Sequence, residues 1–155
     1  MTVDAIDRRI LRALLTDCRQ TVAEIGVVAG LSPSACHRRI RNLEQAGVIS
    51  GYAARLDRRA LGYAMEFFVE VELRSQSDKA LEAFERAVEA MPEILECHLM
   101  AGGTDYLLRV VAVDAGDFER IHRERLSRLP HVARLHSHFA IRTVRPWAGY
   151  PPRET

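Results

Sequence analysis

The first third of the chain places its apolar residues at helical spacing. Between Asp4 and Asp17 these residues are four, one, three and one positions apart, which puts them on one face of a helix. They are Ile6, Ile10, Leu11, Leu14 and Leu15. A second, short helix is predicted from Thr21 to Val28, because Thr21 followed three residues later by Glu24 is typical of a capping box.

A third helix is predicted from Ser32 to Ala46. Ser32 is a favourable N-cap, Pro33 suits the first helical position, and Gly47 is typical of the residue that ends a helix. The turn before this helix contains Gly30, which is free to adopt a positive φ angle. Two helices joined by a three-residue turn with a glycine indicate a helix-turn-helix. A short extended segment over 48–56 is expected to lead out of it.

In the second half of the chain, segments with apolar residues at strand spacing alternate with segments at helical spacing. The elements that we predict there are a strand over 65–73, a helix over 78–91, strands over 94–101 and 106–113, a helix over 114–129 and a strand over 132–144. The end of the first of these strands alternates apolar and acidic residues, which predicts one solvent-facing side. The order β-α-β-β-α-β is that of a ferredoxin-like fold, an antiparallel sheet with both helices on one face. Dimerisation is an economical way to cover the other face.

These patterns predict an α+β protein with a winged-type helix-turn-helix domain and a C-terminal ferredoxin-like βαββαβ domain. The expected divisions are the helix-turn-helix domain over 1–50, a linker strand and hinge over 51–63, the ferredoxin-like domain over 64–145 and a tail over 146–155. The tail is proline-rich, and we expect it to be a mobile arm or a strap across a partner subunit.

Composition narrows the class of protein. With 155 residues, 48% of them hydrophobic, the chain is too apolar for disorder, and its apolar runs are too short to span a bilayer. The charged residues near the N-terminus exclude a signal peptide. Cys18, Cys36 and Cys97 fit neither a disulfide framework nor a zinc pattern. We expect a cytoplasmic protein without a membrane partner.

The charge is divided unevenly along the chain. Residues 1–60 contain ten arginines and six acidic residues, whereas residues 61–155 contain twelve basic and fifteen acidic residues. A basic first part on an acidic second part is typical of a nucleic-acid-binding domain joined to a non-binding one, although a chain so rich in arginine can show the same division by chance.

The third helix has the face that DNA recognition requires. On a helical wheel, Cys36, Ile40 and Leu43 form a buried stripe, and the polar residues lie opposite. Arginine can pair with guanine and glutamine with adenine, and residues near the N-terminus of a recognition helix reach the bases. The predicted DNA-contacting residues are Ser32, Ser34, His37, Arg38, Arg41 and Gln45. Arg39 lies nearer the core edge, and we interpret it as an ion-pairing residue. Taken alone, the face could also be an ordinary solvated one.

Motifs along most of the chain resemble one family of regulators. They lie at residues 7–11 (DRRIL), 30–34 (GLSPS), 39–44 (RIRNLE), 47–52 (GVISGY), 96–99 (ECHL) and 102–108 (GGTDYLL). These segments resemble the leucine-responsive and asparagine-regulator (Lrp/AsnC) transcription factors, and the resemblance covers about residues 5–145. It implies a homodimer that assembles into tetramers or octamers, binds double-stranded promoter DNA sequence-specifically and responds to a small ligand, usually an amino acid, where the second-half domains meet.

The resemblance also implies which residues hold the ligand. These are Leu99, Ala101, Gly102, Gly103, Thr104, Asp105, Leu135, Ser137 and His138. The glycine N–H groups would bind a carboxylate and Asp105 the ammonium group. The family often has two threonines where this chain has Leu135 and Ser137, which implies a somewhat more apolar ligand. From the residues alone, Gly-Gly also indicates a plain hairpin turn, and Asp105 a carboxylate satisfied by local backbone N–H groups.

Two other classes of function were weighed. His136 and His138 lie two apart on a strand and face the same side, as metal ligands do, and His98 could approach from another strand. Zinc requires three or four ligands, and the sequence shows no second tight cluster, so we expect no metal site. The chain also lacks the phosphate-loop, dinucleotide, nucleophile-elbow and zinc-protease motifs. We therefore expect no catalytic residues, no enzyme activity and no cofactor beyond a non-covalent amino-acid effector.

Overall fold

The computed structural model describes residues 2–153, and their contacts divide the chain into two compact units. Residues up to Arg55, together with those from Arg145 onward, form what we call the helical unit. Residues Leu56–Val144 form the sheet unit. The C-terminal residues thus belong to the same unit as the N-terminal helices. The contacts divide the chain after Arg55 and after Val144, whereas the domain limits derived from the sequence fall at 50, 63 and 145 and stay predictions.

The helical unit contains the three predicted helices. They are α1 (Ala5–Thr16), α2 (Val22–Ala29) and α3 (Pro33–Gln45). Thr21 and Glu24 form the capping box expected before α2, Ser32 caps α3, and Gly30 turns the chain between them with a φ of 73°. The helix-turn-helix prediction is confirmed in these details.

Apolar side chains from all three helices meet in one core. Ile10 of α1, Ile25 of α2 and Leu43 of α3 are fully buried there, and each stabilises the fold by about 1.5–3 kcal/mol. After α3, residues 48–55 continue without strand pairing, so the described part of this unit contains no β-hairpin wing. A strand requires a neighbour for its backbone hydrogen bonds, and the described residues offer none here.

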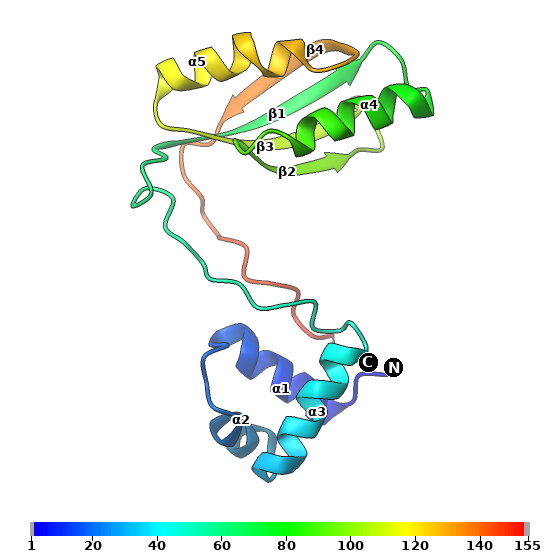
Figure 1. Ribbon diagram of the computed structural model, residues 1–155. Helices are drawn as coiled ribbons and strands as arrows, with labels where there is room; N and C mark the ends of the chain where they lie inside the picture. The colour runs from blue at the N-terminus through cyan, green and yellow to red at the C-terminus, as the bar shows by residue number, and fades with distance from the viewer. Residues whose placement is uncertain (1, 154–155) are drawn as a thin grey trace. The chain divides into compact units, whose positions relative to one another are not determined.

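The sheet unit has the predicted ferredoxin-like order. Its elements are β1 (Met65–Leu73), α4 (Asp78–Glu89), β2 (Ile94–Leu99), β3 (Tyr106–Ala112), α5 (Ala115–Glu124), a 3₁₀ turn η1 (Leu126–Arg128) and β4 (Val132–Phe139). The strands pair antiparallel in the order β2-β3-β1-β4, and both helices cover the same face of the sheet (Figure 1). Val69 of β1, Leu108 of β3 and Phe84 of α4 are fully buried between the layers.

Two elements end five residues earlier than the sequence pattern indicated. The second helix of this unit ends at Glu124 rather than at residue 129, because Arg125 leaves the helical region and the 3₁₀ turn then carries Leu126 and Leu129 into the core. The last strand ends at Phe139 rather than at residue 144. Its neighbour β1 begins at Met65, so residues beyond 140 have no strand to pair with.

Candidate DNA interface and ligand-binding loop

The outward face of α3 carries polar side chains that are exposed to solvent. The exposed residues are Ser34, His37, Arg38, Arg41 and Gln45, as the sequence predicted. Five side chains of this face line a depression of about 310 Å³: His37, Arg38, Arg41, Asn42 and Gln45. Among the described residues, neither Arg38 nor Arg41 makes a side-chain hydrogen bond or ion pair. Their positive charges are therefore available for an external anion or a base edge.

The structure adds detail at two residues of this face, Asn42 and Ser32, the second of which is the predicted N-cap of α3. Asn42 belongs to the depression but was left out of the predicted set, although its position on the helical wheel is only about 40° from that of Arg38. Ser32 is exposed, yet its hydroxyl already accepts a hydrogen bond from the N–H of Ala35 (3.3 Å) and lies 3.2 Å from the hydroxyl of Ser34. Ser32 thus has a structural role as the helix cap.

Arg39 has a different role from its neighbours on α3. Its guanidinium lies 2.7 Å from a carboxylate oxygen of Asp4 and 2.8 Å from one of Asp7, which is buried. A hydrogen bond from the backbone N–H of Asp7, followed by the bond from Arg39, lowers the pKa of Asp4. The interpretation of Arg39 as an ion-pairing residue is confirmed, and these contacts tie α3 to the start of α1.

Burial makes two of the three cysteines poor nucleophiles. Cys36 is fully buried in the helical core, and burial raises the pKa of its thiol. Cys97 packs against the core of the sheet unit, where burial raises the pKa of its thiol to about 11. Since the thiolate is the reactive form, both residues act as small apolar side chains.

The loop between β2 and β3 presents unpaired backbone donors. Among the hydrogen bonds of the described residues, the N–H groups of Gly102 and Gly103 have no acceptor, and both glycines are exposed. Gly102 has a φ of 146°, a conformation that favours glycine. The Thr104 hydroxyl donates to the carbonyl of Val71 (2.9 Å), which anchors the loop to β1.

The Asp105 carboxylate holds the loop against the end of β1. One of its oxygens accepts from the N–H of Leu73 and the other from the Gln76 amide, both at 2.7 Å. The alternative of a carboxylate satisfied within its own turn is therefore wrong, because its partners lie about thirty residues away in sequence. A carboxylate has about four acceptor positions, so capacity for a further donor remains.

The remaining predicted ligand residues lie on different parts of the sheet. Leu135 and Ser137 pair with Val71 and Val69, so they share the helix-covered face, whereas His138 pairs with Phe68 and faces the other way. The strand β1 separates β3 from β4, which places those two strands about 10 Å apart. Leu99 lies on β2, the opposite edge strand, and Ala101 is exposed in the loop after it. One chain alone does not bring these residues into a single pocket.

The open face of the sheet carries a charge network that the sequence pattern did not reveal. Glu66, on the open face of β1, is only 2% exposed because Arg109 of β3 covers it, with 2.6 Å between guanidinium and carboxylate. Arg109 also contacts Glu96 of β2 at 2.8 Å. Burial raises the pKa of Glu96, but its bonds to Arg109 and His98 outweigh this effect and lower it below its ordinary value.

The histidines of this face lie on opposite edges of the sheet. His136 and His138 are on β4, beside glutamates of β1, whereas His98 is on β2. The described residues include no group of three or more histidine, cysteine, aspartate or glutamate side chains that could hold a metal ion. Within the same part of the chain, every helix is too short or too polar to cross a membrane.

Comparisons with known proteins identify both units. Residues 3–44 match the AsnC-type helix-turn-helix domain, and residues 66–147 match the Lrp/AsnC ligand binding domain. The proline dehydrogenase transcriptional activator of Rhodobacter capsulatus is 44% identical over 142 residues, which cover 92% of each protein.

Two solved structures share the fold. A transcriptional regulator from Neisseria meningitidis in complex with L-methionine matches with a TM-score of 0.89 and 32% identity over 94% of each chain. A feast or famine regulatory protein from M. tuberculosis, also complexed with L-methionine, matches with a TM-score of 0.84 and 31% identity over 97% of this chain and 100% of that one. Together these similarities show that the chain belongs to the Lrp/AsnC family of transcription regulators.

Proposed function

We propose that this regulator reads DNA with the outward face of α3 and that an amino acid bound beside the loop over 102–105 changes its DNA affinity. The observation that carries the first part is the pair Arg38 and Arg41, exposed and without a partner among the described side chains, around the depression on α3. Phosphate contacts from such arginines give affinity, and bidentate contacts to guanine give specificity. Asn42 adds an amide that can pair with adenine.

The loop supports an amino acid as the effector. The unpaired N–H groups of Gly102 and Gly103 suit a carboxylate, and Asp105 has acceptor capacity left for an ammonium group. Two structurally similar regulators are complexed with L-methionine. Leu135 and Ser137 would form the more apolar wall that the sequence indicates. The effector is non-covalent, and no other cofactor or catalytic reaction is proposed.

A second copy of the chain would complete the ligand site. The predicted ligand residues lie on both faces and both edges of one sheet, so a single chain does not enclose a ligand. Phe68 is exposed on the open face, next to the Glu66–Arg109 pair, and an apolar side chain there favours association. We therefore propose a cytoplasmic homodimer, able to assemble into tetramers or octamers, with each ligand held where two sheet units meet.

DNA binding is tested by selecting duplexes from a random-sequence pool at low salt and measuring their affinity by fluorescence anisotropy. Arg38→Ala and Arg41→Ala should each weaken binding by roughly 5- to 150-fold, since a bidentate base contact contributes about 1–3 kcal/mol. Where the lost contact is to phosphate, the slope of log affinity against log salt should fall by about one. Arg123→Ala, which removes an exposed arginine of α5, is the matched control. Parental affinity and salt slope in both α3 variants would contradict the assignment.

Ligand sensing is tested with L-methionine and L-leucine as probes in the same assay. Coupling of about 1–3 kcal/mol would change DNA affinity by about 5- to 150-fold. Asp105→Asn should lose this response and keep ligand-free DNA binding. Gln76→Ala removes a partner of Asp105 but leaves the carboxylate, and should retain the response. An unchanged response in Asp105→Asn would place the ligand elsewhere.

A further inference from the structure

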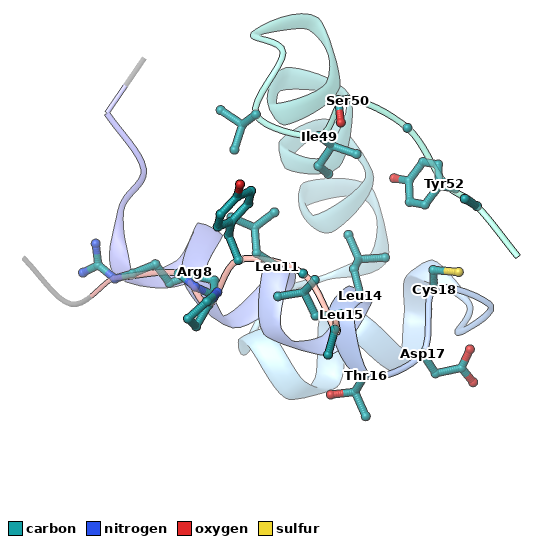
Figure 2. Close-up of a pocket in the computed structure, with 18 of the residues that line it drawn as sticks. Arg8, Leu11, Leu14, Leu15, Thr16, Asp17, Cys18, Ile49, Ser50 and Tyr52 are labelled. Atoms are coloured by element: carbon teal, nitrogen blue, oxygen red, sulfur yellow. The ribbon is translucent and has the colours of Figure 1, made fainter. Parts of the chain in front are cut away.

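The C-terminal residues form one wall of a pocket inside the helical unit. This pocket has a volume of about 1080 Å³ and lies between α1, residues 48–55 and residues 147–153. Figure 2 shows its lining, with Leu11, Leu14 and Leu15 of α1 close to the pale red ribbon of the C-terminal segment. The wall is thus built from residues about a hundred positions away in the sequence.

Two contacts fix the C-terminal residues to this unit. The Arg55 guanidinium donates to the carbonyl of Trp147 at 2.9 Å. At Gly149 the backbone comes so close to α1 that an added Cβ would lie 2.5 Å from Cδ2 of Leu15, and the φ of +92° is one that favours glycine. A residue with a Cβ at this position would displace the Leu15 side chain and would be strained at this φ.

The same residues are held loosely. The side chains of Trp147 and Tyr150 pack edge to face, with 4.7 Å between ring centroids, yet they remain 63% and 83% exposed. Leu15 and Tyr52 of the pocket lining are also partly exposed, at 43% and 52%. A segment with few buried contacts opens at a small free-energy cost, so docking and release of these residues can both be populated.

The position of this segment links it to both halves of the proposed function. It follows β4, which carries Leu135 and Ser137, after a connection of a few residues beyond Phe139. The segment rests against α1. Helix α1 is in turn joined to α3 by the ion pairs of Asp4 and Asp7 with Arg39. The end of β4 and the residues that rest against α1 are therefore joined by a short connection.

We propose that residues 146–153 form a strap that docks on α1 and transmits the ligand-bound state of β4 to the DNA-binding helices. This inference rests on the proposed function, because it assigns the route by which ligand binding alters DNA affinity. A ligand that binds more tightly when the strap is docked, or when it is released, shifts the balance between these two states and so changes DNA affinity. Because such coupling is reciprocal, DNA binding also shifts the balance between the docked and the released strap.

Strap docking is tested first, independently of any ligand. Trp147 is the sole tryptophan of the chain, so its fluorescence anisotropy and its quenching by acrylamide report on the strap. Gly149→Val should lower the anisotropy and increase quenching, because the new side chain collides with Leu15. Gly62→Val is the matched control, since Gly62 has a φ of +91° but no atoms within 4 Å of an added Cβ. Equal Trp147 signals in the two variants would overturn docking.

Coupling is tested by the ratio of DNA affinities with and without L-methionine. Gly149→Val and Arg55→Ala release the strap in different ways, and both should reduce this ratio at least threefold. Arg59→Ala, an exposed arginine whose side chain has no bond to any described residue, should keep the parental ratio. Parental ratios in both release variants would overturn the strap and leave the proposed function intact. If the unmutated protein binds DNA but shows no change in DNA affinity with L-methionine, the ligand part of the proposed function is overturned. The coupling between ligand and strap is then overturned with it. The fluorescence of Trp147 would still test strap docking independently.

Discussion

The outward face of α3 and the helices and strands of the sheet unit use arginine differently. On the recognition helix, Arg38 and Arg41 are exposed and make no bond to another described residue. In the sheet unit, six arginines contact a carboxylate within 4 Å: Arg86, Arg109, Arg120, Arg123, Arg125 and Arg134. The chain as a whole has a net charge of only +1, so the basic character of this face depends both on the excess of arginines in the first sixty residues and on the lack of partners at Arg38 and Arg41.

Arg39 shows that the difference is set by neighbours and not by the unit. It lies between Ile40 and Arg38 on α3, yet it is turned towards α1 and holds Asp4 and Asp7. Adjacent arginines of one helix thus differ: Arg38 is exposed without a side-chain partner among the described residues, and Arg39 joins α3 to α1. Arg109 is a second arginine with a structural role. It covers Glu66, which would otherwise be an unpaired buried charge in the sheet.

The largest expected effect is the loss of the arginine that covers Glu66. Arg109→Ala should lower the free energy of unfolding by about 3–5 kcal/mol, because it leaves a buried carboxylate without its partner. Urea unfolding of the sheet unit, followed by circular dichroism, measures this difference. Replacing both residues, as in Glu66→Met with Arg109→Leu, should restore most of the lost stability, because it leaves no unpaired buried charge.

Arg123→Ala provides the control for that comparison. Its ion pair with Glu119 is on the exposed side of α5, where such pairs contribute roughly 0–1 kcal/mol. If Arg109→Ala cost no more than Arg123→Ala, the Glu66–Arg109 pair would have no special structural role.

The second-largest expected effect is a difference in stability between variants of two neighbouring arginines of α3. Arg39→Ala should destabilise the helical unit by about 1.5–3 kcal/mol, because hydrogen bonds to the buried carboxylate of Asp7 are lost. Arg38→Ala should change stability by less than about 0.5 kcal/mol, as expected for an exposed position, while weakening DNA binding. Thermal unfolding and DNA titration of both variants give the two results. Equal stability of the two variants would mean that the contacts of Arg39 with α1 do not hold the unit together.

Helical periodicity predicted this contrast, but strand periodicity predicted less. The wheel placed Arg38 and Arg39 on different sides of α3 because each helix position has a fixed direction. It would also have included Asn42, had the polar arc been taken 40° wider. Alternation at the end of β1 predicts one solvent-facing side, but it contains no information on which side chain of β3 covers Glu66 on that side.

The ligand site was the least predictable part of the molecule. The resemblance located the loop around Asp105, and alternation along β4 already puts Leu135 and His138 on opposite faces. Which of them shares the helix-covered face, however, depends on the pairing between β1 and β4. The end of β4 likewise depends on where β1 begins, and the docking of the C-terminal residues on α1 depends on a contact at Gly149. These features arise from pairings between distant segments, which local patterns do not encode.

The smallest expected effect is a pH dependence at Glu96. Its pKa in the folded protein is lowered from the ordinary value of 4.5, since bonds to Arg109 and His98 outweigh the effect of burial. The carboxylate therefore stabilises the fold above that value, and this contribution disappears as the pH falls through the lowered pKa.

Glu96→Gln should be less stable than the parent at pH 7 by less than about 1 kcal/mol, because the side chain is 44% exposed. The difference should shrink as the pH falls below 4.5 and through the lowered pKa, as urea unfolding of both proteins over a series of pH values would show. Glu89→Gln, at an exposed carboxylate with no ion pair among the described residues, should show no such trend. A difference of the same size at pH 3 and pH 7 would show that Glu96 acts through packing rather than through charge.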